Sequence, residues 1–300
     1  MHCWKLREPV DRFAVYTYLM GILSRLERIA RTSFGALNDS RQNTAATAHW
    51  LAKGFFDGIQ SSDRAKEPKR LLRYTDRVFS QGIEDGVLQE IFRRVGVASH
   101  TAIEVGTGDG TENNTMYLLF QGWKCLWVEA DTVLTSRTLK THRRWLESGT
   151  LQLNNSMISQ ANTFDLIGPF AQEYSDALDL LSIDIDSQDY WVLQAALKFA
   201  KPRVVVMEYN GNLPPSVSIT VPLNHSEPKG VFYGASLPAL NSLLEKDYAL
   251  VGCTPNGVNA FWVRRDLNLS EFAEPFTVEN HFQPWPFPPL LDNRVDWVRV

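Results

Sequence analysis

Glu104, Gly106, Gly108, Asp109 and Gly110 form an acidic, glycine-rich stretch whose composition suits a nucleotide-like cofactor. Glycine lets the backbone turn sharply and approach a ligand closely, and a helix that starts after such a turn offers unpaired amides. Two carboxylates would repel a diphosphate, so the stretch favours a cofactor with a cationic head, such as the sulfonium and ammonium groups of S-adenosylmethionine. The alternative is a tight turn without a ligand, because spaced glycines alone are a weak signal.

A further acid, Glu129, follows an apolar run about twenty residues later, where the hydroxyls of an adenosine ribose need an acceptor. Ser80 or Gly82 to Asp85 precede a helical pattern and cap that helix, or alternatively Gln81 and Glu84 reach over the cofactor pocket. Asn155 either touches an adenine edge or forms a turn. The full set of candidate cofactor-binding residues is Gln81, Glu104, Gly106, Thr107, Gly108, Asp109, Gly110, Asn114, Thr115, Glu129, Asn155 and Asp184.

Acids occur again where two later apolar runs end, at Asp184, Asp186 and Glu208, and Asn210 follows two residues beyond. Carboxylate and amide oxygens are ligands that Mg²⁺ prefers, so these four residues are candidate ligands of a divalent cation. The alternative is that the acids cap the next helix and contact the hydroxyls of a substrate directly.

If a sulfonium of this kind donates its methyl group to a hydroxyl, the transfer requires an in-line arrangement and removal of the hydroxyl proton. A metal at Asp184, Asp186 and Glu208 would lower the pKa of that hydroxyl. Without a metal, the candidate bases are Asp186, Glu208 and His225. His225 lies in an aperiodic stretch at 211–230 that would cover the site, and its other interpretation is an exposed loop residue without a role.

Regular elements must position these residues. Apolar runs predict strands at 102–105, 125–129, 151–158, 178–186 and 202–208, and helical spacing predicts helices near 113–120, 132–146, 164–174 and 190–200. The continuous apolar run at 178–186 is typical of a strand buried on both faces of a parallel sheet. A helix at 236–246 and strands at 248–253 and 260–264 follow, and Asn256-Gly257 between those strands predicts a hairpin.

Residues 79–267 resemble the FkbM-like branch of the class I S-adenosylmethionine-dependent methyltransferases. The resemblance rests on the order and spacing of SQGIEDGVLQEIF, AIEVGTGDGTENNT, GWKCLWVEAD, LDLLSIDIDSQDYWVL, PRVVVMEYN and YGASLPALNSLL. One departure is Ser187, where relatives often carry a glycine. The resemblance implies an α/β fold with a Rossmann-like, mostly parallel sheet of seven strands and an antiparallel last strand. It also implies O-methylation of a small-molecule or glycan acceptor.

The strand-end acids also look like those of metal-dependent O-methyltransferases. In that group an acid at the end of the fourth strand and an acid-amide pair after the fifth hold a divalent ion. Glu208 and Asn210 would be the pair in this chain, and Mg²⁺ or another divalent cation would be a second cofactor.

The predicted organisation is a helical extension at 1–70, a methyltransferase domain at 71–267 and a tail rich in proline and aromatic residues at 268–300. A polar stretch at 60–70 reads as a linker. The net charge of −4 is unevenly distributed, with +6 over residues 1–77 and −10 over residues 78–300. The acidic main domain argues against nucleic acid as a partner.

The apolar run at 13–23 has eleven residues, which is too short to span a bilayer, and no signal-peptide cleavage pattern follows it. An amphipathic helix at 10–31 would pack on the main domain or on a second copy of the chain, or would contact a membrane surface through its basic residues. Cys3, Cys125 and Cys253 lack metal-ligand spacing and read as reduced thiols. We therefore expect a cytoplasmic protein.

Three other functions compete with O-methyl transfer. A nicotinamide-dependent oxidoreductase is disfavoured by the acids in the glycine stretch. A nucleic-acid amino-methyltransferase needs an acid or amide, two prolines and an aromatic residue after the fourth strand, whereas Asn212-Leu213-Pro214-Pro215-Ser216 follows the fifth. A non-catalytic Rossmann-like scaffold would have lost the motif acids, and they are present.

Overall fold

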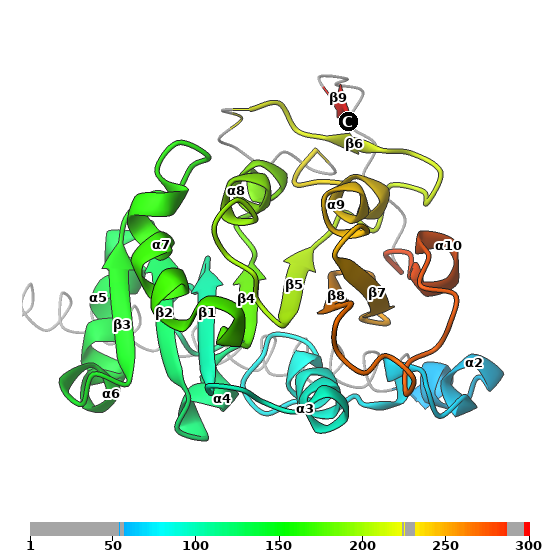
Figure 1. The fold of residues 1–300 in the computed structure, drawn as a ribbon, viewed down its shortest axis with the longest axis horizontal. Helices are drawn as coiled ribbons and strands as arrows, with labels where there is room; N and C mark the ends of the chain where they lie inside the picture. The colour runs from blue at the N-terminus through cyan, green and yellow to red at the C-terminus, as the bar shows by residue number, and fades with distance from the viewer. Residues whose placement is uncertain (1–53, 55–56, 224, 226–231, 287–296) are drawn as a thin grey trace, which may run out of the picture. The chain divides into compact units, whose positions relative to one another are not determined.

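The computed structural model describes Gly54 and residues 57–223, 225, 232–286 and 297–300. Its centre is a seven-stranded sheet with the strand order β3-β2-β1-β4-β5-β8-β7 (Figure 1). The strands are β1 (Thr101–Val105), β2 (Lys124–Glu129), β3 (Leu151–Asn155), β4 (Leu180–Ile183), β5 (Val204–Glu208), β7 (Tyr248–Cys253) and β8 (Asn259–Arg264). Strands β1 to β5 are parallel, and β8 runs antiparallel between β5 and β7. The predicted Rossmann-like α/β sheet with an antiparallel last strand is therefore confirmed.

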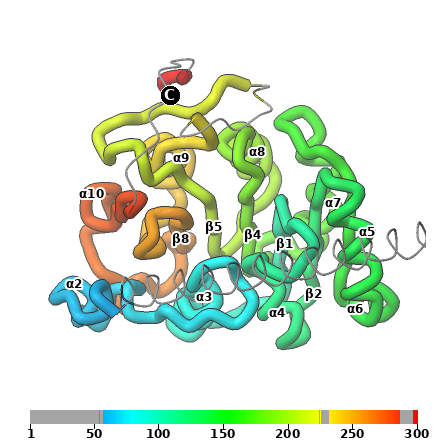
Figure 2. The backbone as a smooth tube through the Cα atoms, turned by 180° about the vertical axis from the view of Figure 1, so that it is seen from behind, coloured from blue at the N-terminus to red at the C-terminus, as the bar shows by residue number. Residues whose placement is uncertain are grey.

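Helices cover the sheet. α7 (Thr163–Tyr174), α8 (Asp189–Ala196) and α9 (Leu237–Leu244) pack side by side on one face (Figure 1). Figure 2 shows the molecule from behind, where α4 (Met116–Phe120) and α5 (Thr132–Thr141) lie over the opposite face. The other helical segments are α2 (Asp63–Lys66), η1 (Leu71–Arg73), α3 (Glu84–Val95), α6 (Arg143–Glu147), η2 (Ser175–Ala177) and α10 (Val278–His281).

The core lies between the sheet and its helices. Every residue of β1 and β4 is buried, as expected for central parallel strands that are covered on both faces. A large apolar cluster joins Ile103, Leu181 and Val205 of the sheet to Leu193 of α8 and Leu240 of α9. Because this layer is closely packed, it fixes the strand ends, and the strand ends carry the candidate site residues.

Three predicted elements end or divide earlier than their sequence patterns suggest. β4 ends at Ile183 because the chain turns beyond it, and Asp186 in that turn has a positive φ of 59°. β3 ends at Asn155, three residues before the predicted end. The predicted helix at 132–146 is divided into α5 and α6 at His142, whose ring is buried and lies 5.3 Å from the Trp127 ring.

The compact unit that contains the sheet begins at Gly58. The stretch at 60–70 belongs to this unit and contains α2, so its interpretation as a linker is wrong. Arg94 of α3 holds the stretch in place, because its Nη1 donates to the carbonyl oxygens of Lys69 and Glu271, each at 2.8 Å. The predicted amphipathic helix at 10–31 lies outside the described residues. Within the described part of the chain, no helix has the length and apolar character needed to cross a membrane.

The described parts of the aperiodic stretch and of the tail meet in a short ribbon. β6 (Ile219–Thr220) pairs antiparallel with β9 (Val298–Arg299). Phe272 and Ala273 of the tail are fully buried. The amide of Trp285 also donates to the carbonyl oxygen of Gly211 at 3.0 Å. These tail residues are therefore integrated into the folded unit.

Candidate active site

A cavity of about 820 Å³ lies at the carboxyl ends of β1, β2 and β4. These strand ends point to the upper edge of the sheet in Figure 1. Open parallel sheets bind ligands outside the carboxyl ends of their strands. The lining contains nine of the residues singled out from the sequence, namely Gln81, Gly106, Thr107, Gly108, Asp109, Glu129, Asp184, Asp186 and His225.

The three glycines of the loop after β1 have positive φ angles, of 85° at Gly106, 59° at Gly108 and 77° at Gly110. A Cβ on Gly106 would lie 1.7 Å from the carbonyl oxygen of Asp184, and a Cβ on Gly110 would lie 2.5 Å from the Trp127 ring. A Cβ on Gly108 would meet no atom within 4 Å. Gly106 and Gly110 therefore allow close packing, whereas glycine is required at Gly108 only for its backbone conformation.

Glu104 supports the loop from beneath and lies outside the described lining of the cavity. Its carboxylate accepts hydrogen bonds from the backbone amides of Asn114 at 2.7 Å and Thr115 at 2.9 Å, and from the Thr115 hydroxyl. Burial raises the pKa of Glu104 to about 7, although these bonds oppose the shift. The sequence argument assigned this charge to the cofactor's cationic end. The structure instead uses it to hold the backbone before α4.

Asn114 and Thr115, which were also candidate cofactor ligands, contribute to the same support. The Asn114 side chain donates to the Ser182 hydroxyl at 3.0 Å, and the Thr115 hydroxyl accepts a bond of 2.7 Å from the Trp127 indole. Both residues are buried beneath the loop. Their part is to fix the shape of the loop that faces the cavity.

Glu129 ends β2 and lines the cavity, as predicted. Its two carboxylate oxygens accept bonds from the backbone amides of Gly108 at 2.7 Å and Asp131 at 2.8 Å. Each oxygen keeps a second lone pair, so the carboxylate can still accept from a ligand hydroxyl. Thr107 beside it is 3% exposed, and its hydroxyl has no hydrogen-bond partner among the described residues. A buried polar atom of this kind on a cavity wall is suited to a ligand.

Asp109 lies at the rim of the cavity, where Arg137 approaches its carboxylate at 3.7 Å. Bonds from Thr111 lower the pKa of Asp109, so the group is ionised. Gln81 also lines the cavity, whereas Glu84 turns away and binds the Gly82 amide and the Asn259 side chain. Of Gln81 and Glu84, only Gln81 is therefore among the residues that line the cavity.

Asn155 lies outside the described lining, because its amide donates to the carbonyl oxygen of Glu129 at 2.9 Å and to the Thr135 hydroxyl at 2.9 Å. The turn-forming interpretation of Asn155 is the one that the structure supports. The residues that follow it, 156–159, line the cavity instead, and sequence reasoning missed them. The predicted strand to residue 158 concealed them, although the break in apolar alternation at Asn154-Asn155 was a usable signal.

Asp184, Asp186 and Glu208 form a cluster, the acid cluster, at the ends of β4 and β5. One oxygen from each lies within 4.8 Å of the others. Burial, followed by the charges of neighbouring carboxylates, raises the pKa of Asp184 to about 8 and that of Glu208 well above its ordinary value. Burial alone raises the pKa of Asp186. The cluster therefore holds protons at neutral pH unless a cation compensates its charge.

Asp189 adds a fourth carboxyl group behind the cluster. It is fully buried, its Oδ1 accepts from the Ile185 amide at 2.9 Å, and its Oδ2 has no partner among the described residues. Asn210, the fourth predicted metal ligand, is engaged elsewhere: its amide donates to the Tyr233 carbonyl at 3.1 Å and its oxygen accepts from Asn212. The contacts of Asn210 thus make it part of the loop after β5.

His225 reaches the cavity from the segment after β6 and is one of its lining residues. The imidazole packs edge-on against Phe232, with ring centroids 4.7 Å apart. Its Nε2 is buried and has no hydrogen-bond partner among the described residues. The interpretation of His225 as an exposed loop residue is therefore wrong, and its place among the cavity residues agrees with its nomination as a base.

The chain was compared with known proteins. No family model matches it, and no curated protein matches it either. Solved structures that resemble it include the glycopeptide N-methyltransferase MtfA complexed with S-adenosyl-L-homocysteine, with 12% identity and a TM-score of 0.36 over 63% of this chain and 93% of that chain. The N-terminal domain of EvdMO1 with S-adenosyl-L-homocysteine bound has 16% identity and a TM-score of 0.39 over 67% and 94%.

A third solved structure is geranyl diphosphate C-methyltransferase from Streptomyces coelicolor A3(2) in complex with Mg²⁺, geranyl diphosphate and S-adenosyl-L-homocysteine. It has 12% identity and a TM-score of 0.30 over 42% of this chain and 47% of that chain. The similar structures thus include S-adenosylmethionine-dependent methyltransferases that act on different atoms. Similarity at this level assigns neither a family nor a substrate to this chain.

Proposed function

We propose that this protein is an S-adenosylmethionine-dependent O-methyltransferase of the FkbM-like branch, acting on a hydroxyl group of a sugar or small metabolite. The observation that carries the proposal is the composition of one cavity. Glu129 lies at the end beside β2, Asp184 and Asp186 lie at the end beside β4, and the glycine loop after β1 lies between them. A cofactor held at the first end would present its reactive group to a substrate held at the second.

The residues present fit this cofactor. Glu129 offers acceptor lone pairs to the ribose hydroxyls, and Gly108 leaves open space beside the loop. The unpartnered hydroxyl of Thr107 is available to a polar group of the ligand. When bound, S-adenosylmethionine supplies a methyl group on a sulfonium that needs no further activation.

The chain itself must orient the acceptor and remove a proton. Asp186 is exposed to the cavity and its pKa is raised by burial, which makes its carboxylate a stronger base than an ordinary aspartate. Glu208 and Asp184 lie within 4.8 Å of it, and their raised pKa values favour the protonated forms, so Asp186 is the member of the cluster that is proposed to accept the hydroxyl proton. His225 is a second candidate base on the cavity wall.

We also propose that the acid cluster binds Mg²⁺ or another divalent cation. Three carboxylates converge there, and Glu208 Oε2 is buried without a partner among the described residues. Hard oxygen donors of this kind suit Mg²⁺. Asp184, Asp186 and Glu208 would hold the ion, and a bound cation would lower the pKa of an acceptor hydroxyl. Asn210 is not required for this arrangement.

The direct test uses S-adenosylmethionine labelled in its methyl group, with a panel of sugars and hydroxylated metabolites, with and without Mg²⁺. The expected product carries the label on an oxygen, and the Asp186→Asn variant makes none. Mass spectrometry that places the label on nitrogen or carbon contradicts the O-methyl assignment. Full activity in chelator contradicts the metal. Tight S-adenosylhomocysteine binding without transfer to any acceptor would favour the scaffold function.

A further inference from the structure

Gln188 connects two segments that line the cavity, the turn with Asp184 and Asp186 and the segment with His225. This part of the cavity is called the acceptor end, because the methyl acceptor is proposed to bind there. Gln188 follows the turn that carries Asp184 and Asp186, and it lines the cavity together with His225. In the sequence, His225 lies far from this turn, so some contact between the two segments must bring it there. The contacts of Gln188 supply this connection.

The Gln188 side-chain amide donates to two backbone carbonyl oxygens, those of Pro222 at 3.1 Å and His225 at 2.7 Å. A primary amide carries two N–H donors, so these acceptors use both. One turn further along α8, the Trp191 indole donates to the Val221 carbonyl at 3.0 Å. Gln188 and Trp191 therefore hold the backbone at Val221, Pro222 and His225.

The turn that bears Gln188 is itself rigid. Asp189 Oδ1 accepts from the Ile185 amide at 2.9 Å, and the Ser187 hydroxyl donates to the Ile185 carbonyl at 3.2 Å. Asp186 has a positive φ of 59° within this turn, a conformation that the surrounding bonds must maintain. Asp186 and Gln188 are thus fixed relative to each other.

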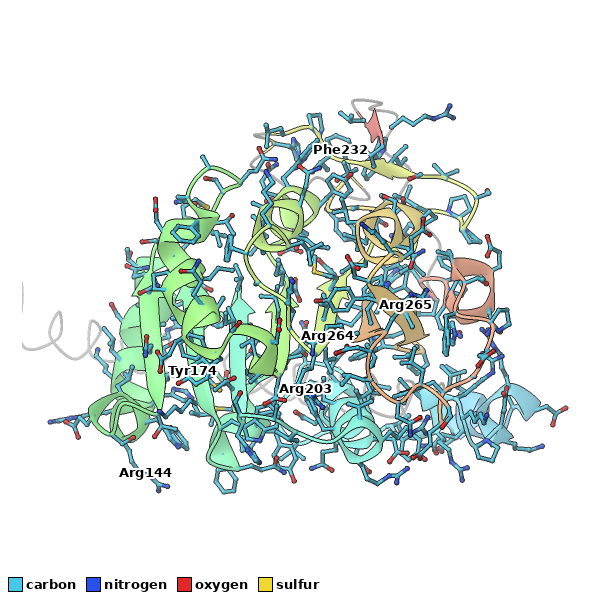
Figure 3. All side chains as sticks on the ribbon, viewed as in Figure 1. Arg144, Tyr174, Arg203, Phe232, Arg264 and Arg265 are labelled. Carbon is cyan, nitrogen blue, oxygen red and sulfur yellow. The ribbon has the colours of Figure 1, made fainter. Side chains whose placement is uncertain are left out.

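The ring of His225 is held from the opposite side. Phe232, labelled in Figure 3 near the upper end of the molecule, packs edge-on against the imidazole at 4.7 Å and against Trp297 at 4.6 Å. Phe232 is 5% exposed, so this contact is desolvated. Gln188 fixes the backbone of His225, and Phe232 fixes its ring plane.

We infer that Gln188 is a positioning residue, which holds His225 against the acceptor end of the cavity so that the imidazole faces the same substrate as Asp186. The inference rests on the proposed function. It explains why a polar residue that is 9% exposed, Gln188, occupies the position before α8. Loss of its two donor groups frees the backbone at Pro222 and His225 while leaving the acid turn intact.

The test measures the reactivity of His225 with diethyl pyrocarbonate, by mass spectrometry, in three variants. Gln188→Glu keeps the side-chain shape but replaces the amide donors with oxygens, whereas Gln188→Leu removes them. Both should raise the labelling rate of His225 roughly tenfold, as expected when hydrogen bonds that close a local segment are lost. Gln194→Leu is the matched control, because Gln194 lies on α8 and its oxygen accepts from Gln160 instead. It should leave the His225 rate unchanged.

The imidazole signals in a two-dimensional NMR spectrum provide a second measurement. The His225 signal should move in both Gln188 variants, while those of the buried His142 and His281 remain in place. If Gln188→Glu behaves as wild type, the side chain acts by packing alone and the inference is wrong. An equal response to Gln194→Leu would also overturn it. Neither the labelling rate nor the NMR signal of His225 depends on a cofactor or an acceptor. If the wild-type protein failed to bind S-adenosylhomocysteine, the proposed function would be wrong, but the effect of the Gln188 variants on His225 would still be measurable.

Discussion

Asp184 follows β4 and Glu208 ends the neighbouring parallel strand β5, and one carboxylate oxygen of each lies within 4.8 Å of the other. Burial raises the pKa of both groups, and the charges of neighbouring carboxylates add to the shift. Two carboxyl groups this close cannot both be ionised without cost, so the pair either shares a proton or is compensated by a cation. This relationship connects the fold to the proposed chemistry. In that chemistry a carboxylate of the acid cluster accepts the proton of the acceptor hydroxyl, and a bound cation lowers the pKa of that hydroxyl.

The first prediction is that stability falls as the pH rises. A group whose pKa is raised on folding stabilises the protein fully below its unfolded value, and this stabilisation is lost as the pH passes through the folded value. For Asp184 these values are 3.8 and about 8. Glu104, raised to about 7, and Asp189, raised to about 6, act in the same direction. Thermal unfolding between about pH 5 and pH 8 measures the effect.

Millimolar Mg²⁺ should restore most of the stability lost at the alkaline end, because the cation replaces the protons of the acid cluster. Asp184→Asn should show a flatter pH profile and a smaller response to Mg²⁺. A midpoint that responds to Mg²⁺ equally in wild type and in Asp184→Asn would place the ion elsewhere.

The second prediction concerns Glu129. Replacing it with alanine should weaken S-adenosylhomocysteine binding by roughly 1.5–3 kcal/mol, the range for a hydrogen bond to a charged group. Glu129→Gln should lose less, because its amide oxygen still accepts one bond. Asn154→Ala is a suitable control, since Asn154 donates to the Leu166 carbonyl rather than to the loop at Glu129. Calorimetry that gives equal affinity for Glu129→Ala and wild type would remove Glu129 from the ribose site.

The strands and the glycine loop could be predicted from the sequence because apolar runs and spaced glycines are local signals. Gly106, for example, requires glycine for both its φ of 85° and its contact with Asp184. The role of Glu104 could not be predicted in the same way. Its charge is visible in the sequence, but its partners, the amides of Asn114 and Thr115, are reached only after the loop has folded back.

Contacts between distant segments were similarly hidden. The hydrogen bond from Gln188 to the His225 carbonyl joins residues 37 positions apart, and no periodic pattern in the sequence predicts it. The contacts of Asn210 were hidden for a related reason. A strand-end amide beside an acid resembles a metal ligand in sequence, and its bond to the Tyr233 carbonyl of a neighbouring loop becomes visible only in three dimensions.

The third prediction separates packing from backbone conformation in the loop. Gly106→Ala should abolish folding or cofactor binding, because its Cβ would lie 1.7 Å from a backbone oxygen that cannot move away easily. Gly108→Ala should cost about 1 kcal/mol of stability, the strain of a positive φ without a clash. Thermal unfolding and S-adenosylhomocysteine titration of both variants would test the difference. Equal effects of the two substitutions would mean that the loop packs differently.

The fourth prediction concerns the ion pair of Glu90 with Arg94 on α3. Their side chains are 7% and 2% exposed, and Glu90 Oε1 accepts from Arg94 Nε at 2.7 Å. Glu90→Ala should destabilise the protein by about 3–5 kcal/mol, because it leaves a buried guanidinium without the carboxylate that balances its charge. S-adenosylhomocysteine affinity should be retained in the folded fraction, since Glu90 is not among the residues that line the cavity. Lys198→Ala is the control, because Lys198 is exposed and lies just after α8. This substitution should have little effect on stability.

The lowered pKa of Glu90 in the same ion pair can be tested by unfolding at acidic pH. Burial opposes ionisation of Glu90, but bonds from Arg93 and Arg94 outweigh it and lower its pKa to about 2. A lowered pKa contributes stability that is present above the unfolded value and is lost as the pH falls towards the folded value. Wild type should therefore lose stability between about pH 4.5 and pH 2 more steeply than Glu90→Gln. Parallel acid-unfolding curves for the two proteins would contradict this account.

Calorimetric titration of the wild-type protein with S-adenosylhomocysteine, alongside NAD⁺, tests the central claim most directly. The cavity predicts saturable binding of S-adenosylhomocysteine with one site per chain and no binding of the dinucleotide, because the ionised carboxylate of Asp109 at the rim of the cavity repels a diphosphate. Asp186→Asn should bind S-adenosylhomocysteine within about tenfold of wild type, a difference of roughly 1.4 kcal/mol. Failure of the wild type to bind S-adenosylhomocysteine at millimolar concentration, or a preference for NAD⁺, would contradict the assignment of this cavity to a methyltransferase.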